Sequence, residues 1–92
     1  TPDILASVAR RPDAPYCVGF AAESEDLVHH ATEKRARKGI PLLVGNLGPA
    51  TFGQDDNTLI LVDEHGTRTL PAGSKTALAR WLAQELGRRL PA

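Results

Sequence analysis

The chain has 92 residues, of which 41% are hydrophobic and 24% are charged, and these proportions are typical of one small globular domain. Its 11 basic and 11 acidic residues cancel, so no overall charge favours binding to nucleic acid or to a membrane surface. One cysteine excludes an internal disulfide and fits a reducing compartment, and no apolar run has the length of a transmembrane helix. We therefore expect a cytoplasmic protein and, because the chain opens directly on a helix-start signal without Met, a fragment of a longer one.

The chain begins with a predicted helix that leads into a strand. Thr1 is the expected N-cap, with Pro2 at the first helical position and Asp3 in the first turn, and the helix is expected to end near Arg10. The strand is expected over 16–21. Its apolar residues do not alternate with polar ones, which predicts that it is covered on both faces, as in parallel α/β sheets.

A second helix is expected from about Glu25 to Lys38, with Ser24 as its N-cap and Gly39 just past its end. Acidic residues cluster at its start and basic residues at its end, which matches the helix dipole. A short strand is expected over 40–44. Strand, helix and strand within about thirty residues predict a right-handed βαβ unit with parallel strands.

The second half of the chain predicts a loop over 45–57 and then a β-hairpin with strands 58–62 and 67–70, the latter at an edge. Ser74 is the expected cap of a final helix that ends near Arg89. One face of that helix is apolar at helical spacing, and it consists of Ala77, Leu78, Trp81, Leu82 and Leu86. The predicted fold class is α/β, with helices packed on a sheet that combines a parallel βαβ unit with a β-hairpin.

Lys34 and Lys38 give the sharpest indication of a binding site. On a helical wheel of about 100° per residue, both continue the apolar stripe of Leu27 and Ala31 that should face the sheet. Two inward ammonium groups need anionic partners, which a phosphate-bearing ligand at the carboxyl ends of the strands would supply. The residues alone favour a simpler alternative, in which both side chains reach past the core to water and complement the helix C-terminus.

The other candidate residues also have simpler explanations. Asp3 can bind a ligand hydroxyl or amino group, but stabilising a helix N-terminus accounts for it, and Phe20 can stack on a base or fill core. The basic run 34–38 could contact nucleic acid, although it lacks interleaved aromatic residues. His29 and His30 point about 100° apart on their helix, and with one cysteine in the chain no metal cage is expected.

Six segments form an ordered pattern across almost the whole chain. They are 1–5 (TPDIL), 18–23 (VGFAAE), 34–39 (KRARKG), 43–46 (LVGN), Phe52-Gly53 with Asp56-Asn57, and Ser74-Lys75. Together they resemble the carboxyl-terminal part of phosphopantothenoylcysteine synthetase, which in many bacteria is fused behind a flavin-dependent decarboxylase. We therefore expect residues 1–92 to be the carboxyl-terminal part of such a domain, incomplete without its upstream half.

The resemblance implies a Rossmann-like, dimeric ligase of coenzyme A biosynthesis. In that family 4'-phosphopantothenate attacks CTP with Mg²⁺ present, which gives an acyl-cytidylate and pyrophosphate, and L-cysteine then displaces CMP to form the amide. FMN belongs only to the fused decarboxylase. By the same resemblance, the nucleotide contacts fall on Pro2, Asp3, Ile4, Leu5, Phe20, Lys34 and Lys38. No catalytic residue and no metal ligand is assigned.

Two features depart from the family pattern. Gly45-Asn46-Leu47 stands where the family usually has Ala-Asn-Asp, so any role of that acidic side chain is lost or moved. The family's amino-terminal half, with its glycine-rich nucleotide loop and the asparagine that handles the acyl intermediate, is absent. We therefore expect that this chain alone does not catalyse the ligation. The alternative function is a non-catalytic interaction or nucleotide-binding module.

Overall fold

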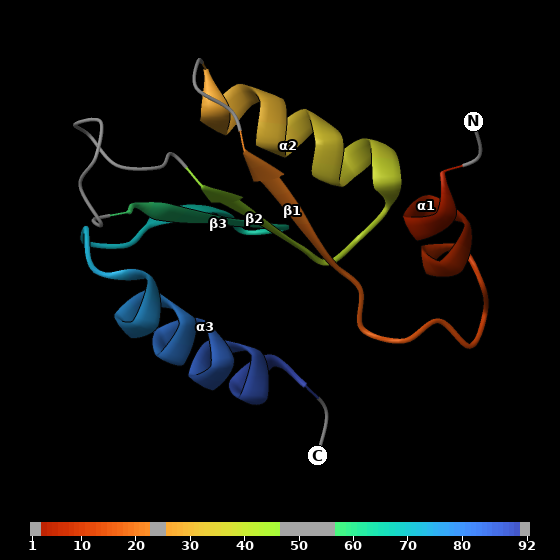
Figure 1. The fold of residues 1–92 in the computed structure, drawn as a ribbon. Coiled ribbons are helices and arrows are strands. Elements are labelled where there is room, and N and C mark those ends of the chain that lie inside the picture. The colour runs from red at the N-terminus through yellow and green to blue at the C-terminus, as the bar shows by residue number, and fades with distance from the viewer. Residues whose placement is uncertain (1–2, 23–25, 47–56, 91–92) are drawn as a thin grey trace.

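The computed structural model describes residues 3–22, 26–46 and 57–90. Within these ranges one four-stranded sheet has α2 on one face and α3 on the other, with α1 beside the end of α2 (Figure 1). The elements in chain order are α1 (Ile4–Ala9), β1 (Val18–Ala22), α2 (Leu27–Lys38), β2 (Leu42–Asn46), β3 (Leu59–Asp63), β4 (Gly66–Thr69) and α3 (Lys75–Arg89). This arrangement confirms the predicted α/β class.

The sheet joins one parallel pair to a hairpin. β1 pairs in parallel with β2, and its Gly19 lies opposite Leu43. β2, β3 and β4 then pair antiparallel in that order, with Leu43 opposite Val62 and Asp63 opposite Gly66 at the hairpin turn. The parallel βαβ pairing and the hairpin are both confirmed, and β4 lies at an edge of the described sheet.

β2 is the centre of the core because it is buried on both faces of the sheet. Successive residues of a strand point to opposite faces, so Leu42 and Leu43, both 0% exposed, belong to separate clusters. The cluster on the α2 side contains Cys17, Ala21, Ala31, Ile40, Leu43, Ile60 and Val62, with Leu5, Val8 and Ala9 of α1 packed against it. The cluster on the α3 side contains Leu42, Val44 and Leu61, covered by Trp81, Leu82 and Leu86.

Two helix ends confirm the predicted capping residues. α3 begins after Ser74, whose hydroxyl accepts a hydrogen bond from the backbone N–H of Ala77 at 3.1 Å. α2 ends at Gly39, which adopts a left-handed conformation (φ 67°) that glycine reaches without steric cost. The start of α2 is later than predicted, with Asp26 at the N-cap position, and Ser24 lies outside the described residues.

The start of α1 also differs from the prediction. The helix begins at Ile4, and its N-cap is Asp3, not Thr1. Asp3 has the extended backbone typical of a capping residue, and its side chain accepts a hydrogen bond from the backbone N–H of Ala6. Thr1 and Pro2 lie outside the described residues.

The expectation that β1 is covered on both faces is wrong. Gly19 and Ala21 are buried on the α2 side, whereas Phe20 points to the other side and is 65% exposed. The reason is that β1 is an edge strand of the described sheet, and the α3-side cluster is centred on β2 and β3. The unbroken apolar run therefore combines small residues on the covered face with an uncovered aromatic ring on the opposite face.

α3 buries a carboxylate that its apolar pattern does not predict. The leucines and the tryptophan of the predicted face are buried or half-buried, but Ala77 lies at the margin of that face and is exposed. Glu85, in contrast, is only 7% exposed. It accepts hydrogen bonds from Arg88 and from Nε of Arg89, so its buried charge is satisfied.

Among the described residues, every helix is too short or too polar to span a bilayer.

Candidate functional site

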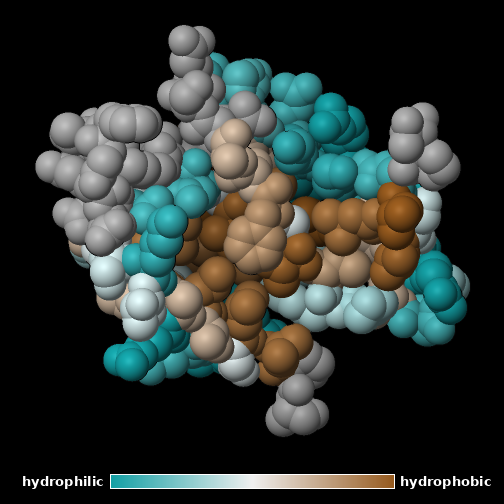
Figure 2. Space-filling view, viewed as in Figure 1, coloured by the Kyte–Doolittle hydropathy of each residue, from teal (hydrophilic) through white to brown (hydrophobic). Residues whose placement is uncertain are grey.

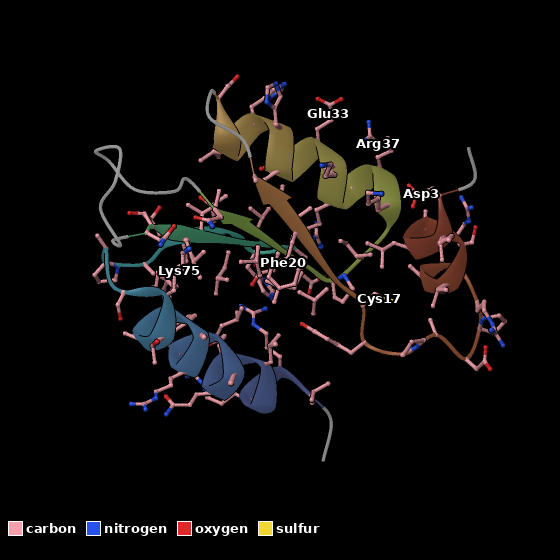
Figure 3. All side chains as sticks on the ribbon, viewed as in Figure 1. Asp3, Cys17, Phe20, Glu33, Arg37 and Lys75 are labelled. Atoms are coloured by element: carbon pink, nitrogen blue, oxygen red, sulfur yellow. The ribbon has the colours of Figure 1, made fainter. Side chains whose placement is uncertain are left out.

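Asp3 joins the first turn of α1 to the last turn of α2. Its Oδ1 accepts the hydrogen bond from the backbone N–H of Ala6 at 3.0 Å, and its Oδ2 accepts one from Nζ of Lys38 at 2.8 Å. The side chain of Lys38 is 20% exposed and that of Asp3 41% exposed. Figure 3 shows Asp3 beside the end of α2. The structure thus brings together two residues that the sequence assigns to the nucleotide.

The charge of Asp3 is stabilised by its surroundings. The hydrogen bond from Lys38 lowers the pKa of the Asp3 carboxyl most, and the backbone N–H of Ala6 lowers it further. The positive charge of Arg37 acts in the same direction, and together these effects outweigh the small loss of solvation. At neutral pH the pair is therefore an ion pair between two charged groups.

The Asp3–Lys38 pair should make stability depend on pH in the acid range. Because the pKa of Asp3 is lowered on folding, the pair stabilises the fold above the carboxyl's ordinary value of 3.8 and is lost as pH falls through the lowered value. Asn also caps helices well, so Asp3→Asn removes the charge and keeps the cap. We expect this variant to melt below the parent at about pH 6 and by a smaller gap at about pH 3, below the carboxyl's ordinary value. An equal gap at both pH values would contradict the prediction.

α2 runs back along the sheet, and this direction decides where its lysines lie. A helix that joins two parallel strands returns antiparallel to them, so only its first turn is near their carboxyl ends (Figure 1). Lys38 ends α2 just before β2 begins, at the amino ends of the strands. The expected position at the carboxyl ends is therefore wrong. Lys34 and Lys38 are nonetheless half-buried, and neither extends fully into water.

The remaining predicted nucleotide residues do not all meet at this junction. Leu5 packs against the α2-side cluster, whereas Ile4 is 76% exposed. Phe20 points to the opposite face of the sheet from α2, in a region where the space-filling view shows apolar surface (Figures 2 and 3). Pro2 lies outside the described residues. The junction of α1 and α2 is thus the part of the predicted site that the fold assembles.

A second polar cluster, which the sequence reasoning missed, lies where the end of α3 meets the hairpin turn. Nη1 of Arg89 is 3.1 Å from Oδ2 of Asp63, and its Nε is 2.8 Å from Oε2 of Glu85. Burial alone would lower the pKa of Arg89, but hydrogen bonds to Tyr16, Asp63 and Glu85 outweigh it and raise the pKa. The spacing of Glu85 and Arg89 on one helix face is the signal that could have revealed this network.

Asp63 is held in its charged form by the same network. Burial favours its neutral form, yet hydrogen bonds from the backbone N–H of His65 and from Arg89 lower its pKa overall. Asp63 and Arg89 line a cavity of about 310 Å³ together with Arg35. Since the carboxylates and the guanidinium of Arg89 already satisfy one another, we assign this network to the stability of the fold.

Within the described ranges, no group of three or more acidic, histidine or cysteine side chains is placed to hold a metal ion.

Comparison with known proteins identifies the family. Residues 1–89 match the family model described as DNA/pantothenate metabolism flavoprotein C-terminal domain. The chain belongs to this family. Similar relatives include the coenzyme A biosynthesis bifunctional proteins CoaBC of Escherichia coli (strain K12), 39% identical over 89 residues, and of Bacillus subtilis (strain 168), 37% identical over 91 residues. These alignments cover 92% and 94% of this chain and 22% of each relative.

Two solved structures share the fold of this family member. The C-terminal domain of CoaBC superposes with a TM-score of 0.74 at 26% identity, covering 94% of this chain and 40% of that chain. The DNA/pantothenate metabolism flavoprotein from Streptococcus pneumoniae superposes with a TM-score of 0.75 at 19% identity, covering 98% of this chain and 40% of that chain. The chain thus spans about a fifth of the length of the CoaBC relatives, 22% of each, and two fifths of the solved domains. The family resemblance in the sequence is confirmed.

Proposed function

We propose that this chain is the nucleotide-binding part of a CTP-dependent ligase of coenzyme A biosynthesis. The ligase joins 4'-phosphopantothenate to cysteine through an acyl-cytidylate, and residues 1–92 form the carboxyl-terminal part of its synthetase domain. The observation that carries the proposal is the α1–α2 junction, where Asp3 and Lys38 meet and Lys34 lies one turn away. Membership of a family whose relatives are named for coenzyme A biosynthesis supports it.

The chemistry of the proposed reaction needs positive charge beside the nucleotide phosphates. A carboxylate oxygen of phosphopantothenate attacks the α-phosphorus of CTP, the bond to the bridging oxygen breaks, and pyrophosphate leaves with the electron pair. Negative charge grows on the leaving group during this step, and fixed ammonium groups stabilise it. Lys34 and Lys38 supply such groups at one end of α2, and Lys34 also aligns the phosphates for attack. Cysteine then displaces CMP from the acyl-cytidylate.

The proposal assigns no described residue to Mg²⁺. The described residues contain no cluster of carboxylates that fits a metal ion, and Mg²⁺ in nucleotide enzymes is held largely by phosphate oxygens and water. FMN belongs, in this proposal, to a separate decarboxylase part of the parent protein. The parent is proposed to be a cytoplasmic dimer, and this chain by itself is expected to bind nucleotide without completing the ligation.

A CTP titration followed by NMR tests the proposed nucleotide site. We expect CTP to shift the backbone amides of Asp3, Phe20, Lys34 and Lys38. Lys34→Ala should weaken CTP binding about tenfold, because a charge-assisted contact to phosphate is lost. Arg80→Ala is the matched control: it removes one positive charge from an exposed position on α3, on the other face of the sheet. Equal affinities of the two variants, or no response to CTP, would contradict the proposal.

A second candidate function is an interaction module that adds to another sheet. The exposed ring of Phe20 on an edge strand of the described sheet favours it, because unpaired strand edges with apolar side chains accept further strands. This candidate predicts no response to CTP and a concentration-dependent broadening of the amide signals of β1. The same NMR samples therefore separate the two functions.

A further inference from the structure

A groove runs along one side of α2, next to the junction with α1. Its lining consists of His30, Glu33, Lys34 and Arg37, and its volume is about 220 Å³. These positions follow the spacing i, i+3, i+4 and i+7, so they form a single stripe along the helix. Figure 3 shows Glu33 and Arg37 projecting from α2 on the side away from the sheet. The stripe ends close to Asp3, whose pKa responds to the charge of Arg37.

None of the three basic groups in this groove, His30, Lys34 and Arg37, has a carboxylate partner in the described part of the chain. Neither Lys34 nor Arg37 forms a salt bridge with a described acidic residue, although Lys34 is half-buried. The carboxylate of Glu33 lies 3.5 Å from Nε2 of His29, on the neighbouring turn. The groove therefore carries an excess of positive charge, which an anionic ligand would balance.

The other cations at the end of α2 are already engaged. Lys38 donates to the Asp3 carboxylate at 2.8 Å and is 20% exposed, so an incoming phosphate would have to compete with a bound carboxylate. Arg35 lies on the opposite flank of the helix and donates to the backbone carbonyl of Pro41 at 3.3 Å. Of the basic run 34–38, Lys34 and Arg37 alone combine a shared groove with the lack of a described acidic partner.

We propose that this groove holds the phosphate chain of the nucleotide, with Arg37 and Lys34 as its two cationic contacts and His30 as a further hydrogen-bond donor at its far end. The inference rests on the proposed nucleotide function and adds Arg37 and His30 to its site. A guanidinium can present two parallel N–H groups to one phosphate, which an ammonium cannot do, so Arg37 orients the phosphate as well as attracting it. Lys38 remains paired with Asp3 in this arrangement.

Binding measurements with CTP and with cytidine, which lacks phosphate, test the groove. Arg37→Gln should weaken CTP binding about tenfold and leave cytidine binding unchanged, because only the phosphate contact is lost. Arg35→Gln is the matched control, since it removes the same charge from the opposite flank of the same helix and should change neither affinity. Melting curves of both variants, expected to match the parent, show that the fold is retained.

The outcomes separate the two proposals. If the chain binds neither CTP nor cytidine, the nucleotide function and the groove both fail. The second outcome is that the chain binds CTP but Arg37→Gln loses no more CTP affinity than Arg35→Gln. In that case the nucleotide function stands and the groove assignment fails. A loss of CTP affinity confined to Arg37→Gln, with competition by inorganic tripolyphosphate in the parent, supports the groove.

Discussion

Replacing Leu43 with alanine should lower the free energy of unfolding by about 3 kcal/mol, because the change opens a cavity in the centre of the α2-side core. Leu43 is 0% exposed and lies in the cluster with Ala31, Ile40 and Val62, between α2 and the sheet. Little of the lost volume can be refilled, since β2 is held by a hydrogen-bonded neighbour on each side. Urea denaturation followed by circular dichroism measures the loss.

Leu59→Ala is a control for this prediction. Leu59 is half-buried at the start of β3 and packs at the margin of the other cluster, so its truncation should cost about 1 kcal/mol. A domain of this size has a total stability of roughly 5–15 kcal/mol, so Leu43→Ala should show a much lower midpoint than Leu59→Ala. Equal losses of unfolding free energy in the two variants would show that α2 does not cover this face of the sheet as closely as the structure indicates.

The order and pairing of the elements could be predicted because local signals mark them. Ser74 and Gly39 fix helix ends through their own hydrogen bonding and backbone freedom, and these signals are visible in one sequence. The exposure of Phe20 could not be predicted in the same way. Whether a strand lies at an edge depends on which other strands are present, and the apolar run of β1 is compatible with a covered or an uncovered face.

The helical wheel predicted that the two lysines of the candidate site are not fully exposed, but the sequence did not reveal the partner of Lys38. The helical wheel predicts that Lys34 and Lys38 continue the apolar stripe of α2 that faces the sheet, and in the structure both are half-buried. The end of the sheet at which the two lysines lie follows from the direction of α2, and the predicted βαβ unit already implies that direction. The partner of Lys38 does not follow from any local pattern, because Asp3 lies 35 residues away and reaches it only through the packing of α1.

Gly19 controls that packing of α1 against the sheet. A Cβ atom at this position would lie 2.7 Å from Cδ1 of Ile40 and 3.5 Å from side-chain carbons of Leu43 and Leu5. Ile40 is 2% exposed, so its terminal methyl group has little room to move aside. The absence of a side chain at Gly19 therefore allows Leu5 of α1 and Ile40, just before β2, to pack closely on β1. This packing keeps Asp3 within reach of Lys38.

Gly19→Val should consequently destabilise the fold by about 2 kcal/mol, because overpacking at a buried contact outweighs the better strand propensity of valine. The added side chain should displace Leu5 together with α1, and this movement should weaken the ion pair between Asp3 and Lys38. Asp3→Asn should therefore cost less stability in this variant than in the parent, and a double-mutant cycle measures the difference. Gly87→Ala is the control. Apart from its two chain neighbours and the backbone of its own helix, no described atom lies within 4 Å of the added Cβ, and alanine in a helix interior should raise stability by about 1 kcal/mol. If Gly19→Val were as stable as the parent, or left the cost of Asp3→Asn unchanged, close packing at β1 would not be what positions the α1–α2 junction.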